Sequence, residues 1–323
     1  MDYRKDIFSP IADEFDEFSR RYTSLFSCEN QAVDLLLKFL LRRKGKQMRP
    51  ALVLLTSKCF GQIPDSVYHL ASAVELLHQG SLIHDDVVDE SEKRRGLRSA
   101  NAAFDNRIAV LLGDFIVSKA LQEITATDNL DSVGALSGLI GTLSEGEITQ
   151  LNALGLDNLS EDLYFEIISK KTANLFSSST SLAALLSGAS EQEIKAFHTF
   201  GLIAGLCFQI MDDILDYHDT DETGKPSGND LKEGKFTLPA IYALNSSDRD
   251  WSSHIKAIRG LYATPFQIAE VTEYTLSNGG IQYAENKMQE LKKQAMDSLP
   301  AFISSDLRKA FQSYLDLIVN RQK

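Results

Sequence analysis

The chain has 323 residues, of which 43% are hydrophobic and 24% are charged, a composition typical of a globular protein with enough apolar material for a core. Its 45 acidic and 33 basic residues give a formal net charge of -12, which argues against general attraction to nucleic acid or to anionic lipid surfaces. The 3 cysteines are too few and too widely spaced for a disulfide framework or a cysteine-rich metal site.

The first residues are charged and lack the apolar core of a secretory signal. No apolar run reaches the roughly 18 residues that a transmembrane helix requires. Because the cysteine content also suits a reducing compartment, we expect a cytoplasmic protein without a transmembrane segment.

Apolar residues recur at helical spacing along most of the chain, and no segment shows the alternation typical of a strand. No proline lies between Pro64 and Pro226, so long helices are allowed there. We predict an all-α fold, a single domain over 1–323, and helices over residues 66–90, 107–124, 135–151, 162–186, 192–217 and 284–323. The predicted start signal of the first of these is Pro64-Asp65-Ser66.

The clearest interruption is 218–235, which is rich in Gly, Asp, Lys and Pro and is predicted to be a loop. A linker between domains is one interpretation. The residues on its two sides carry related chemistry, however, and this favours a lid over an active site.

Two segments of the same form stand late in predicted helices: 85–89 reads DDVVD and 212–216 reads DDILD. Positions i and i+4 of a helix share a face, so Asp85 lies beside Asp89 and Asp212 beside Asp216. Like charges at this spacing repel, and hard divalent cations would remove the repulsion. One such motif is weak evidence, because solvated acidic helix ends are common. Two copies, each ending an apolar helix, indicate magnesium ions that hold a diphosphate and stabilise its departure.

Polar side chains near these helices are candidates for stabilising the carbocation that remains when the diphosphate departs. Thr172 and Gln209 lie within apolar runs, where each needs a hydrogen-bonding partner. With Lys171 they would supply oriented dipoles beside a cation. The alternative is that they make ordinary hydrogen bonds between packed helices.

Basic residues form local groups that contrast with the acidic composition. Arginine suits a phosphate because its planar fork donates two hydrogen bonds at once. Taken singly, each of these residues is typical of a solvated surface; together they predict two diphosphate sites. The groups are Lys46 with Arg49, Arg94 with Arg95, and Lys225 with Lys235.

The chain resembles the trans-isoprenyl diphosphate synthases, the polyprenyl synthetase family, and most of all its long-chain, octaprenyl-type members. The resemblance covers nearly the whole chain and is carried by seven ordered blocks: GKQMRP, ELLHQGSLIHDDVVDESEKRRG, GDF, GEITQ, KTANLF, FQIMDDILDY and GKPSGNDLKEGKFTLP. It implies one large helical bundle around a central cavity, a homodimer, and magnesium as cofactor, with three ions accompanying the allylic diphosphate. The implied reaction is head-to-tail addition of isopentenyl diphosphate to an allylic diphosphate, through ionisation, attack by the double bond and proton loss.

The resemblance also assigns roles by position. Asp85, Asp89 and Asp212 match the main magnesium ligands, with Asp216 supporting. The positions that match the isopentenyl diphosphate site are Lys46, Arg49, His78 and Arg95. Those that match the allylic diphosphate site are Arg94, Lys171, Thr172, Gln209, Lys225 and Lys235, of which Lys171, Thr172, Gln209 and Lys235 are the expected catalytic residues.

Product length is predicted from the side chains that precede Asp85. One helical turn advances about 5.4 Å, comparable to one extended isoprene unit. In the family, a bulky aromatic side chain four or five positions before the first aspartate closes the cavity, whereas this chain has Gly80 and Ser81 there. We therefore expect an all-trans polyprenyl product longer than geranylgeranyl, with Leu77 as a later stop. A geranylgeranyl or farnesyl diphosphate synthase is the alternative, and Gly80 and Ser81 would then simply permit tight helix packing.

Three other functions would account for part of this pattern. A terpene cyclase would normally replace the second DDxxD motif, which this chain keeps. A metal-dependent phosphohydrolase would use His69, His78 and His84, but leaves the second motif and the arginine pairs unexplained. A regulatory partner of a catalytic subunit would typically lack some of the aspartates, and all are present.

Overall fold

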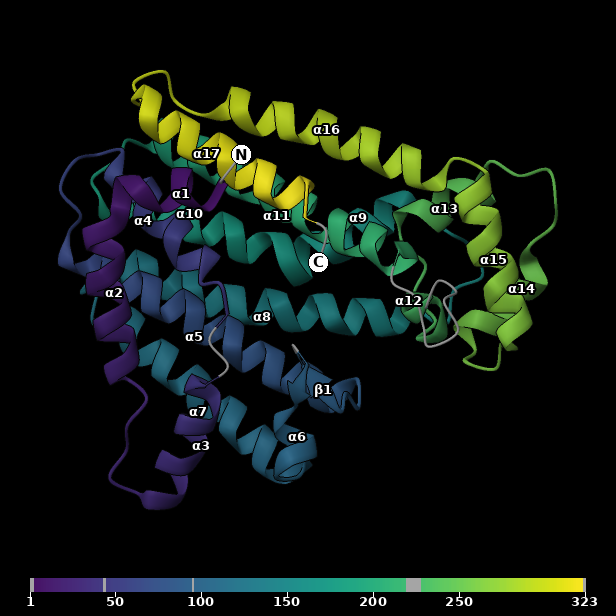
Figure 1. The fold of residues 1–323 in the computed structure, drawn as a ribbon, viewed down its shortest axis with the longest axis horizontal. Coiled ribbons are helices and arrows are strands. Elements are labelled where there is room, and N and C mark those ends of the chain that lie inside the picture. Colours follow the sequence, from purple (N-terminus) through teal and green to yellow (C-terminus); the bar gives the residue numbers. More distant parts are fainter. Residues whose placement is uncertain (1–2, 43–44, 95, 219–227, 322–323) are drawn as a thin grey trace. The chain divides into compact units, whose positions relative to one another are not determined.

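The computed structural model describes residues 3–42, 45–94, 96–218 and 228–321. These residues are almost entirely helical, which confirms the predicted all-α class (Figure 1). The first half of the chain contains α1 (Tyr3–Phe8), a 3₁₀ turn η1 (Ser9–Ile11), α2 (Ala12–Ser24), α3 (Gln31–Leu41), α4 (Met48–Lys58), α5 (Asp65–Val88), β1 (Lys93–Arg94), β2 (Leu97–Arg98), α6 (Ala100–Ala103), α7 (Asn106–Thr125) and α8 (Leu130–Ala153).

The second half continues with helices of very different length. They are α9 (Glu161–Ile168), a π-helical turn η2 (Ser169–Ala173), α10 (Asn174–Leu186), α11 (Glu191–His218), α12 (Asn229–Lys232), α13 (Leu238–Asn245), α14 (Ser252–Arg259), α15 (Pro265–Ser277), α16 (Gly280–Ser298) and α17 (Ser305–Val319).

The chain divides into two compact units. Unit 1 comprises Met1–Ile140, Ser178–Phe197 and Pro300–Phe311, and unit 2 comprises Gly141–Ser177, His198–Leu299 and Gln312–Lys323. Four of the five boundaries between them fall inside α8, α10, α11 and α17, and the fifth falls between α16 and α17. The single domain expected over 1–323 stays a prediction.

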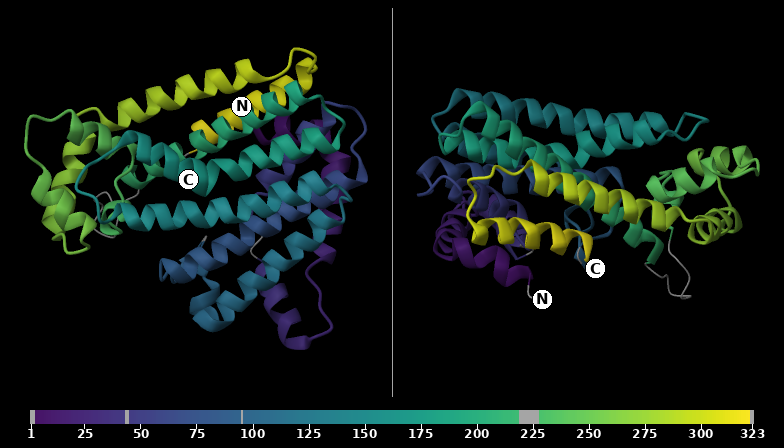
Figure 2. Two further views of the ribbon diagram at one scale, coloured as in Figure 1. Left: turned by 180° about the vertical axis from the view of Figure 1, so that it is seen from behind. Right: turned by 90° about the horizontal axis from the view of Figure 1, so that it is seen from above.

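Unit 1 is organised around α5, which lies alongside α7 in Figures 1 and 2. Pro64 stands before α5 in an extended conformation, and its fixed backbone angle favours a clean helix start. The helix then buries most of its apolar residues, including Val67, Leu70, Val74 and Leu77. α4 is buried along nearly its whole length and packs against the same helix.

Unit 2 contains the C-terminal part of α11 and a group of helices, α13 to α16, that pack on one another. The rings of Tyr242 in α13 and Tyr283 in α16 stack with centroids 4.0 Å apart. The Tyr283 hydroxyl also donates to the Glu161 carboxylate, 2.9 Å from Oε2, and so ties α16 to the start of α9.

Four details differ from the sequence-based expectations. The predicted helix over 162–186 contains the π-helical turn η2, and the one over 284–323 is interrupted between α16 and α17, where Pro300 cannot continue a helix. The short antiparallel pair β1–β2 follows the first aspartate motif. The predicted loop over 218–235 lies partly outside the described residues, and its described part includes the one-turn helix α12.

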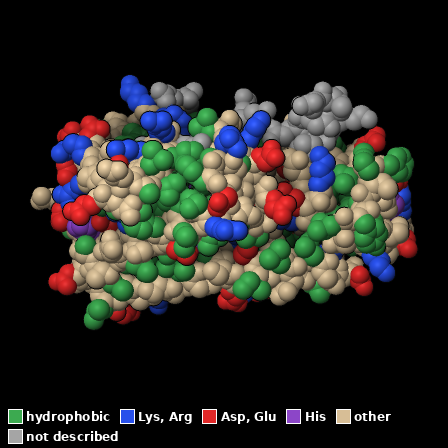
Figure 3. All heavy atoms as spheres, turned by 90° about the horizontal axis from the view of Figure 1, so that it is seen from below, with side chains coloured by type: hydrophobic (Ala, Val, Ile, Leu, Met, Phe, Trp, Pro, Cys, Tyr) green, Lys and Arg blue, Asp and Glu red, His purple; other side chains and the backbone are tan. Residues whose placement is uncertain are grey.

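Two observations bear on the surface of the molecule. On the face shown in Figure 3, acidic and basic side chains are interspersed, with hydrophobic side chains exposed between them. Among the described helices, α11 has the length and composition of a membrane-spanning segment. Half of its most apolar window is buried inside the structure, however, as is typical of the core helix of a soluble protein.

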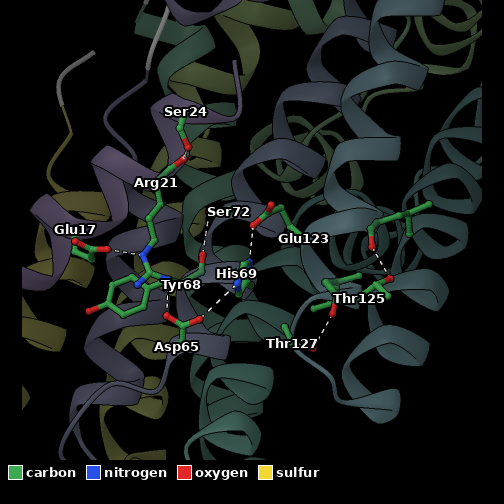
Figure 4. A network of polar contacts seen from close by, with 12 residues as sticks. Glu17, Arg21, Ser24, Asp65, Tyr68, His69, Ser72, Glu123, Thr125 and Thr127 are labelled. Atoms are coloured by element: carbon green, nitrogen blue, oxygen red, sulfur yellow. Dashed lines mark hydrogen bonds and ion pairs between the residues drawn. The ribbon is translucent and has the colours of Figure 1, made fainter. Parts of the chain in front are cut away.

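A network of charged side chains links α2, α5 and α7 within unit 1 (Figure 4). Arg21 donates to Glu17 Oε1 at 2.5 Å and to Asp65 Oδ1 at 2.6 Å. His69 Nδ1 lies 2.9 Å from Glu123 Oε2, and His69 Nε2 lies 3.6 Å from Asp65 Oδ2. Asp65 therefore connects the two halves of the network.

We expect this network to contribute to stability only above the acid range. Hydrogen bonds from Arg21 lower the pKa of both Glu17 and Asp65. An acid whose pKa is lowered by folding stabilises the native state above its unfolded pKa, near 4, and loses this contribution as the pH falls through the folded value. Thermal unfolding of Arg21→Met should therefore occur at a lower temperature than wild type at pH 7, and the difference should be smaller at pH 3. Arg20→Met is the matched control, because Arg20 is 75% exposed and pairs only on the surface with Glu17. An equal loss at both pH values would show that Arg21 acts through packing.

Candidate active site

The first aspartate motif lies at the C-terminal end of α5 in unit 1. The Asp89 backbone N–H donates to the Asp85 carbonyl oxygen at 2.8 Å, so the helical turn continues through the motif. Asp85 is half-buried and Asp89 is exposed, whereas Asp86 is only 4% exposed. Arg94 Nε donates to Asp86 Oδ1 at 2.6 Å. The structure thus places two of the three carboxylates at or near the surface and buries the third beside Arg94.

The second motif, in α11 of unit 2, has the same division. Asp213 is 4% exposed, while Asp212 and Asp216 are half-buried. Asp216 accepts backbone N–H groups from Asn229 and Asp230, each at 3.2 Å.

Asp212 forms an ion pair with Arg321, near the C-terminal end of the chain. The Arg321 guanidinium carbon also lies 4.8 Å from the centre of the Phe208 ring, a cation–π contact. Burial lowers the pKa of Arg321, which nevertheless remains protonated because arginine starts so high.

The donor set of each motif fits magnesium. Each accessible pair offers carboxylate oxygens, which this ion prefers. Magnesium has six coordination positions, and two carboxylates leave some of them open. Within the described residues no group of three or more His, Cys, Asp or Glu side chains is arranged to hold a metal. Water and the oxygens of a phosphorylated substrate would complete the shell, as is usual for magnesium in phosphoryl chemistry.

A cavity of about 150 Å³ in unit 2 is lined by several of the predicted site residues. Lys171, Thr172, Gln209 and Lys235, the four expected catalytic residues, all line it. Asp212 and Asp216 are not among the lining residues. Its walls also include apolar side chains, among them Leu154, Leu163, Ile167, Ile168, Phe236 and Ile241.

The π-helical turn η2 presents Lys171 and Thr172 together. A π turn adds a residue to the helical repeat and is common at functional sites. The Thr172 hydroxyl donates to Gln209 Oε1 at 2.8 Å, and Lys171 Nζ lies 2.6 Å from Glu147 Oε2. α11 approaches this turn at Gly205, where a Cβ atom would lie 2.5 Å from the Ala173 Cα. Only glycine allows this approach.

Sequence reasoning missed three titratable side chains at this cavity, two aspartates and a tyrosine. Burial raises the pKa of Asp213 to about 6, and raises the pKa of Asp230 and of Tyr164 well above their ordinary values. The Tyr164 hydroxyl donates to Asp213 Oδ2 at 2.6 Å. Asp213 belongs to the recognised motif but was not assigned a role. No local sequence motif marks Tyr164 as functional, because it occupies an ordinary apolar position of its helix.

A smaller cavity of about 60 Å³ in unit 1 brings together His78, Asp86 and Arg94. Arg94, which was assigned to the allylic diphosphate, thus shares a cavity with His78, which was assigned to isopentenyl diphosphate. Lys46 and Arg49 are not among its lining residues; Lys46 is exposed and lines a shallow hollow beside α1 and α2. Arg95 and Lys225, also predicted to bind substrate, lie outside the described residues.

The three predicted chain-length positions have different surroundings in unit 1. Gly80 is buried where α5 crosses α7, and a Cβ atom there would lie 2.8 Å from Val117 Cγ2. This supports the helix-packing interpretation of Gly80. Ser81 is half-buried and its hydroxyl donates to the His78 carbonyl oxygen at 3.0 Å, and Leu77 is 2% exposed. Their role in setting product length stays a prediction, and Ser81 is the better position for testing it.

Comparisons with known proteins cover nearly the whole chain. A model of the polyprenyl synthetase family matches residues 30–275. The chain is 34% identical to an all-trans-nonaprenyl-diphosphate synthase (geranyl-diphosphate specific) of Rhodobacter capsulatus, over 99% of each protein.

Solved structures are similar over the same extent. A geranylgeranyl pyrophosphate synthase from Bacteroides thetaiotaomicron is 37% identical with a TM-score of 0.85, and the match covers 99% of this chain and 100% of that one. A polyprenyl synthase from Caulobacter crescentus CB15, complexed with calcium and isoprenyl diphosphate, is 30% identical with a TM-score of 0.90 and coverage of 99% and 98%.

The close approach at η2 generates a prediction about Gly205. Gly205→Ala should destabilise the protein by roughly 1–3 kcal/mol, because the added methyl group overpacks a buried contact. Its melting temperature should fall, and the displaced turn should misplace Lys171 and Thr172. Gly141→Ala in α8 is the control, since its added methyl group meets nothing within 4 Å and alanine favours a helix. Equal melting temperatures for the two variants would contradict the packing argument.

Proposed function

Because the chain belongs to the polyprenyl synthetase family, we propose that it is a magnesium-dependent trans-prenyltransferase that joins isopentenyl diphosphate to an allylic diphosphate. One observation carries the proposal. The cavity of unit 2 combines two lysines, which suit a diphosphate, with the bonded pair Thr172 and Gln209, which presents oxygen dipoles. It does so beside the helix that carries the second aspartate motif.

In this reaction the allylic C–O bond breaks and its electron pair leaves with the diphosphate. Lys171 and Lys235 are proposed to hold that diphosphate by charge-assisted hydrogen bonds. Magnesium, when bound by Asp85 and Asp89 or by Asp212 and Asp216, supplies stabilisation of the charge that builds on the leaving group. The number of ions is proposed to be three.

The allylic cation that remains needs nearby oxygen dipoles and little water. Thr172 and Gln209 are proposed to supply these dipoles. The π electrons of the isopentenyl double bond then form the new C–C bond. Loss of a proton to the released diphosphate restores a double bond and leaves a product five carbons longer. His78 and Arg94 are proposed to bind diphosphate in unit 1, with Lys46, Arg49 and Arg95 as further candidates from the sequence.

The product is proposed to be longer than geranylgeranyl diphosphate. The relative from Rhodobacter capsulatus is named for a nonaprenyl product, and Ser81 is small where a bulky side chain would end the cavity. Geranylgeranyl diphosphate is the second candidate, because the solved synthase with 37% identity is named for that product.

The remaining expectations are also proposals. A homodimer is supported by exposed apolar side chains on α7 and at the start of α8, where Leu111 is 64% and Leu130 is 88% exposed. A cytoplasmic location is supported by the cysteines, which are too few and too widely spaced for a disulfide framework and suit a reducing compartment. A terpene cyclase is disfavoured by the intact second motif, and the phosphohydrolase interpretation by the histidines, since His69 lies among the charged side chains of Figure 4 and His84 pairs with Asp114.

The reaction is tested with purified protein, magnesium, isopentenyl diphosphate and geranyl or farnesyl diphosphate, followed by separation of the dephosphorylated products by length. We expect a ladder that ends beyond geranylgeranyl and disappears when EDTA removes the metal. Asp85→Asn and Asp212→Asn should each lower kcat by about a hundredfold or more, as expected when transition-state charge loses its counter-charge. Asp306→Asn, on the exposed start of α17, is the control. Absence of product with every allylic starter would refute the proposal.

Product length is tested at Ser81. A phenylalanine there adds a ring about one helical turn from Asp85, so Ser81→Phe should shorten the product by several isoprene units. Ser81→Ala keeps the side chain small and should leave the ladder unchanged. Gly80→Phe is unsuitable because its ring would collide with α7. If Ser81→Phe makes the wild-type ladder at a normal rate, the side chain at 81 does not limit length.

A further inference from the structure

A continuous chain of hydrogen bonds joins four residues in the wall of the unit 2 cavity. The Thr172 hydroxyl donates to Gln209 Oε1 at 2.8 Å, and Gln209 Nε2 donates to Asp213 Oδ1 at 2.9 Å. The Tyr164 hydroxyl donates to the other oxygen of the same carboxylate, Asp213 Oδ2, at 2.6 Å. All four residues line the cavity.

We propose that Asp213, held by Tyr164, is a positioning residue that fixes which end of the Gln209 amide faces Thr172. The inference rests on the proposed function and adds a role for the second aspartate of the DDILD motif. It also assigns Tyr164 to the machinery of the reaction, although this residue lies outside both aspartate motifs.

The two ends of the Gln209 side-chain amide differ in what they can bind. Its oxygen only accepts hydrogen bonds and its NH₂ group only donates them. An ionised carboxylate only accepts, so Asp213 must face the NH₂ group. The carbonyl oxygen of Gln209 then necessarily faces Thr172, as the structure shows. An apolar side chain at 213, which accepts no hydrogen bond, would remove this selection.

In the selected orientation, the negative end of the Gln209 amide dipole is the one that would face a carbocation. The negative ends of the Gln209 carbonyl and of the Thr172 hydroxyl lie together at the cavity, where an allylic cation would be stabilised by such dipoles. After a half-turn of the amide its positive NH₂ end would lie there instead. The same side chain would then oppose the charge that develops.

Burial distinguishes Asp213 from the proposed metal ligands. The residue is 4% exposed, whereas Asp212 keeps 39% of its side chain exposed. Asp216 also accepts hydrogen bonds on both oxygens but is half-buried, so burial rather than hydrogen bonding separates the two roles. Tyr164 is 6% exposed, and its hydrogen bond holds the Asp213 carboxylate in place.

The test compares two replacements of nearly equal size. Asn at 213 retains an oxygen that accepts from Gln209, and its NH₂ group can donate to the Tyr164 hydroxyl, which also accepts. Leu retains neither. We expect Asp213→Leu to lower kcat about tenfold to a hundredfold while KM for each diphosphate changes less than about threefold, and Asp213→Asn to recover most of the loss.

A double-mutant cycle shows whether Asp213 acts through Gln209. In a Gln209→Leu background, Asp213→Leu should cost little further activity, because the amide that it orients is gone. Tyr164→Phe should cause a smaller loss of kcat than Asp213→Leu. Tyr283→Phe removes another hydroxyl that binds a carboxylate in unit 2 and should retain wild-type kcat. Melting temperatures identify any variant that fails to fold.

Two outcomes would overturn the inference. Equal losses for Asn and Leu, with a raised magnesium requirement, would make Asp213 a metal ligand. Fully additive losses in the cycle would show that Asp213 does not act through Gln209.

A spectroscopic measurement separates failure of this inference from failure of the proposed function, because it needs no turnover. In protein labelled with ¹⁵N-glutamine, the side-chain NH₂ signal of Gln209 is assigned by its loss in Gln209→Leu. Its hydrogens should exchange slowly with solvent in wild type and in Asp213→Asn, and rapidly in Asp213→Leu. Identical exchange in all three would refute the orientation of Gln209 by Asp213 even if the enzyme forms prenyl diphosphates.

Discussion

The repeat of the α-helix decides which carboxylates of each aspartate motif act together. Residues four apart lie on one side of a helix, while the residue just after the first is turned by about 100°. Asp85 and Asp89 therefore remain accessible, whereas Asp86 is buried and bonded to Arg94. The same rule buries Asp213 in the second motif. A motif of three aspartates thus consists of an accessible pair, which suits a divalent cation, and a single buried carboxylate directed into the protein.

Burying these carboxylates lowers the stability of the fold, and the proposed function explains why they are kept. A buried carboxylate loses its hydration, and the raised pKa of Asp213 expresses this loss. Hydrogen bonds from Tyr164 and Gln209 compensate part of it, because charged acceptors form the stronger hydrogen bonds. Natural proteins retain such groups where geometry matters more than stability, and apolar replacement of buried ionic groups is often neutral or stabilising. The cavity of unit 2 is such a place.

Much of this was predictable from the sequence, and the exceptions have physical causes. The helical repeat of apolar residues located α5, α7 and α11 to within a residue or two at most ends, because burial of one stripe dominates local structure. The π-helical turn was missed, since its extra residue depends on close packing at Gly205 rather than on local propensity. The apolar runs around Thr172 and Gln209 indicated that each needs a hydrogen-bonding partner, although spacing does not show which one. The two aspartate pairs were within reach of spacing rules. Tyr164 was not, because its partner is 49 residues away and only the folded chain brings them together.

The ion pair between Arg321 and Asp212 links the residues after α17 to the second aspartate motif. A carboxylate that ligates a cation attracts a guanidinium group less, so a cation bound at Asp212 would weaken its pair with Arg321. Asn320 and Arg321 follow the last helix, and a weaker ion pair would make their backbone more accessible to a protease.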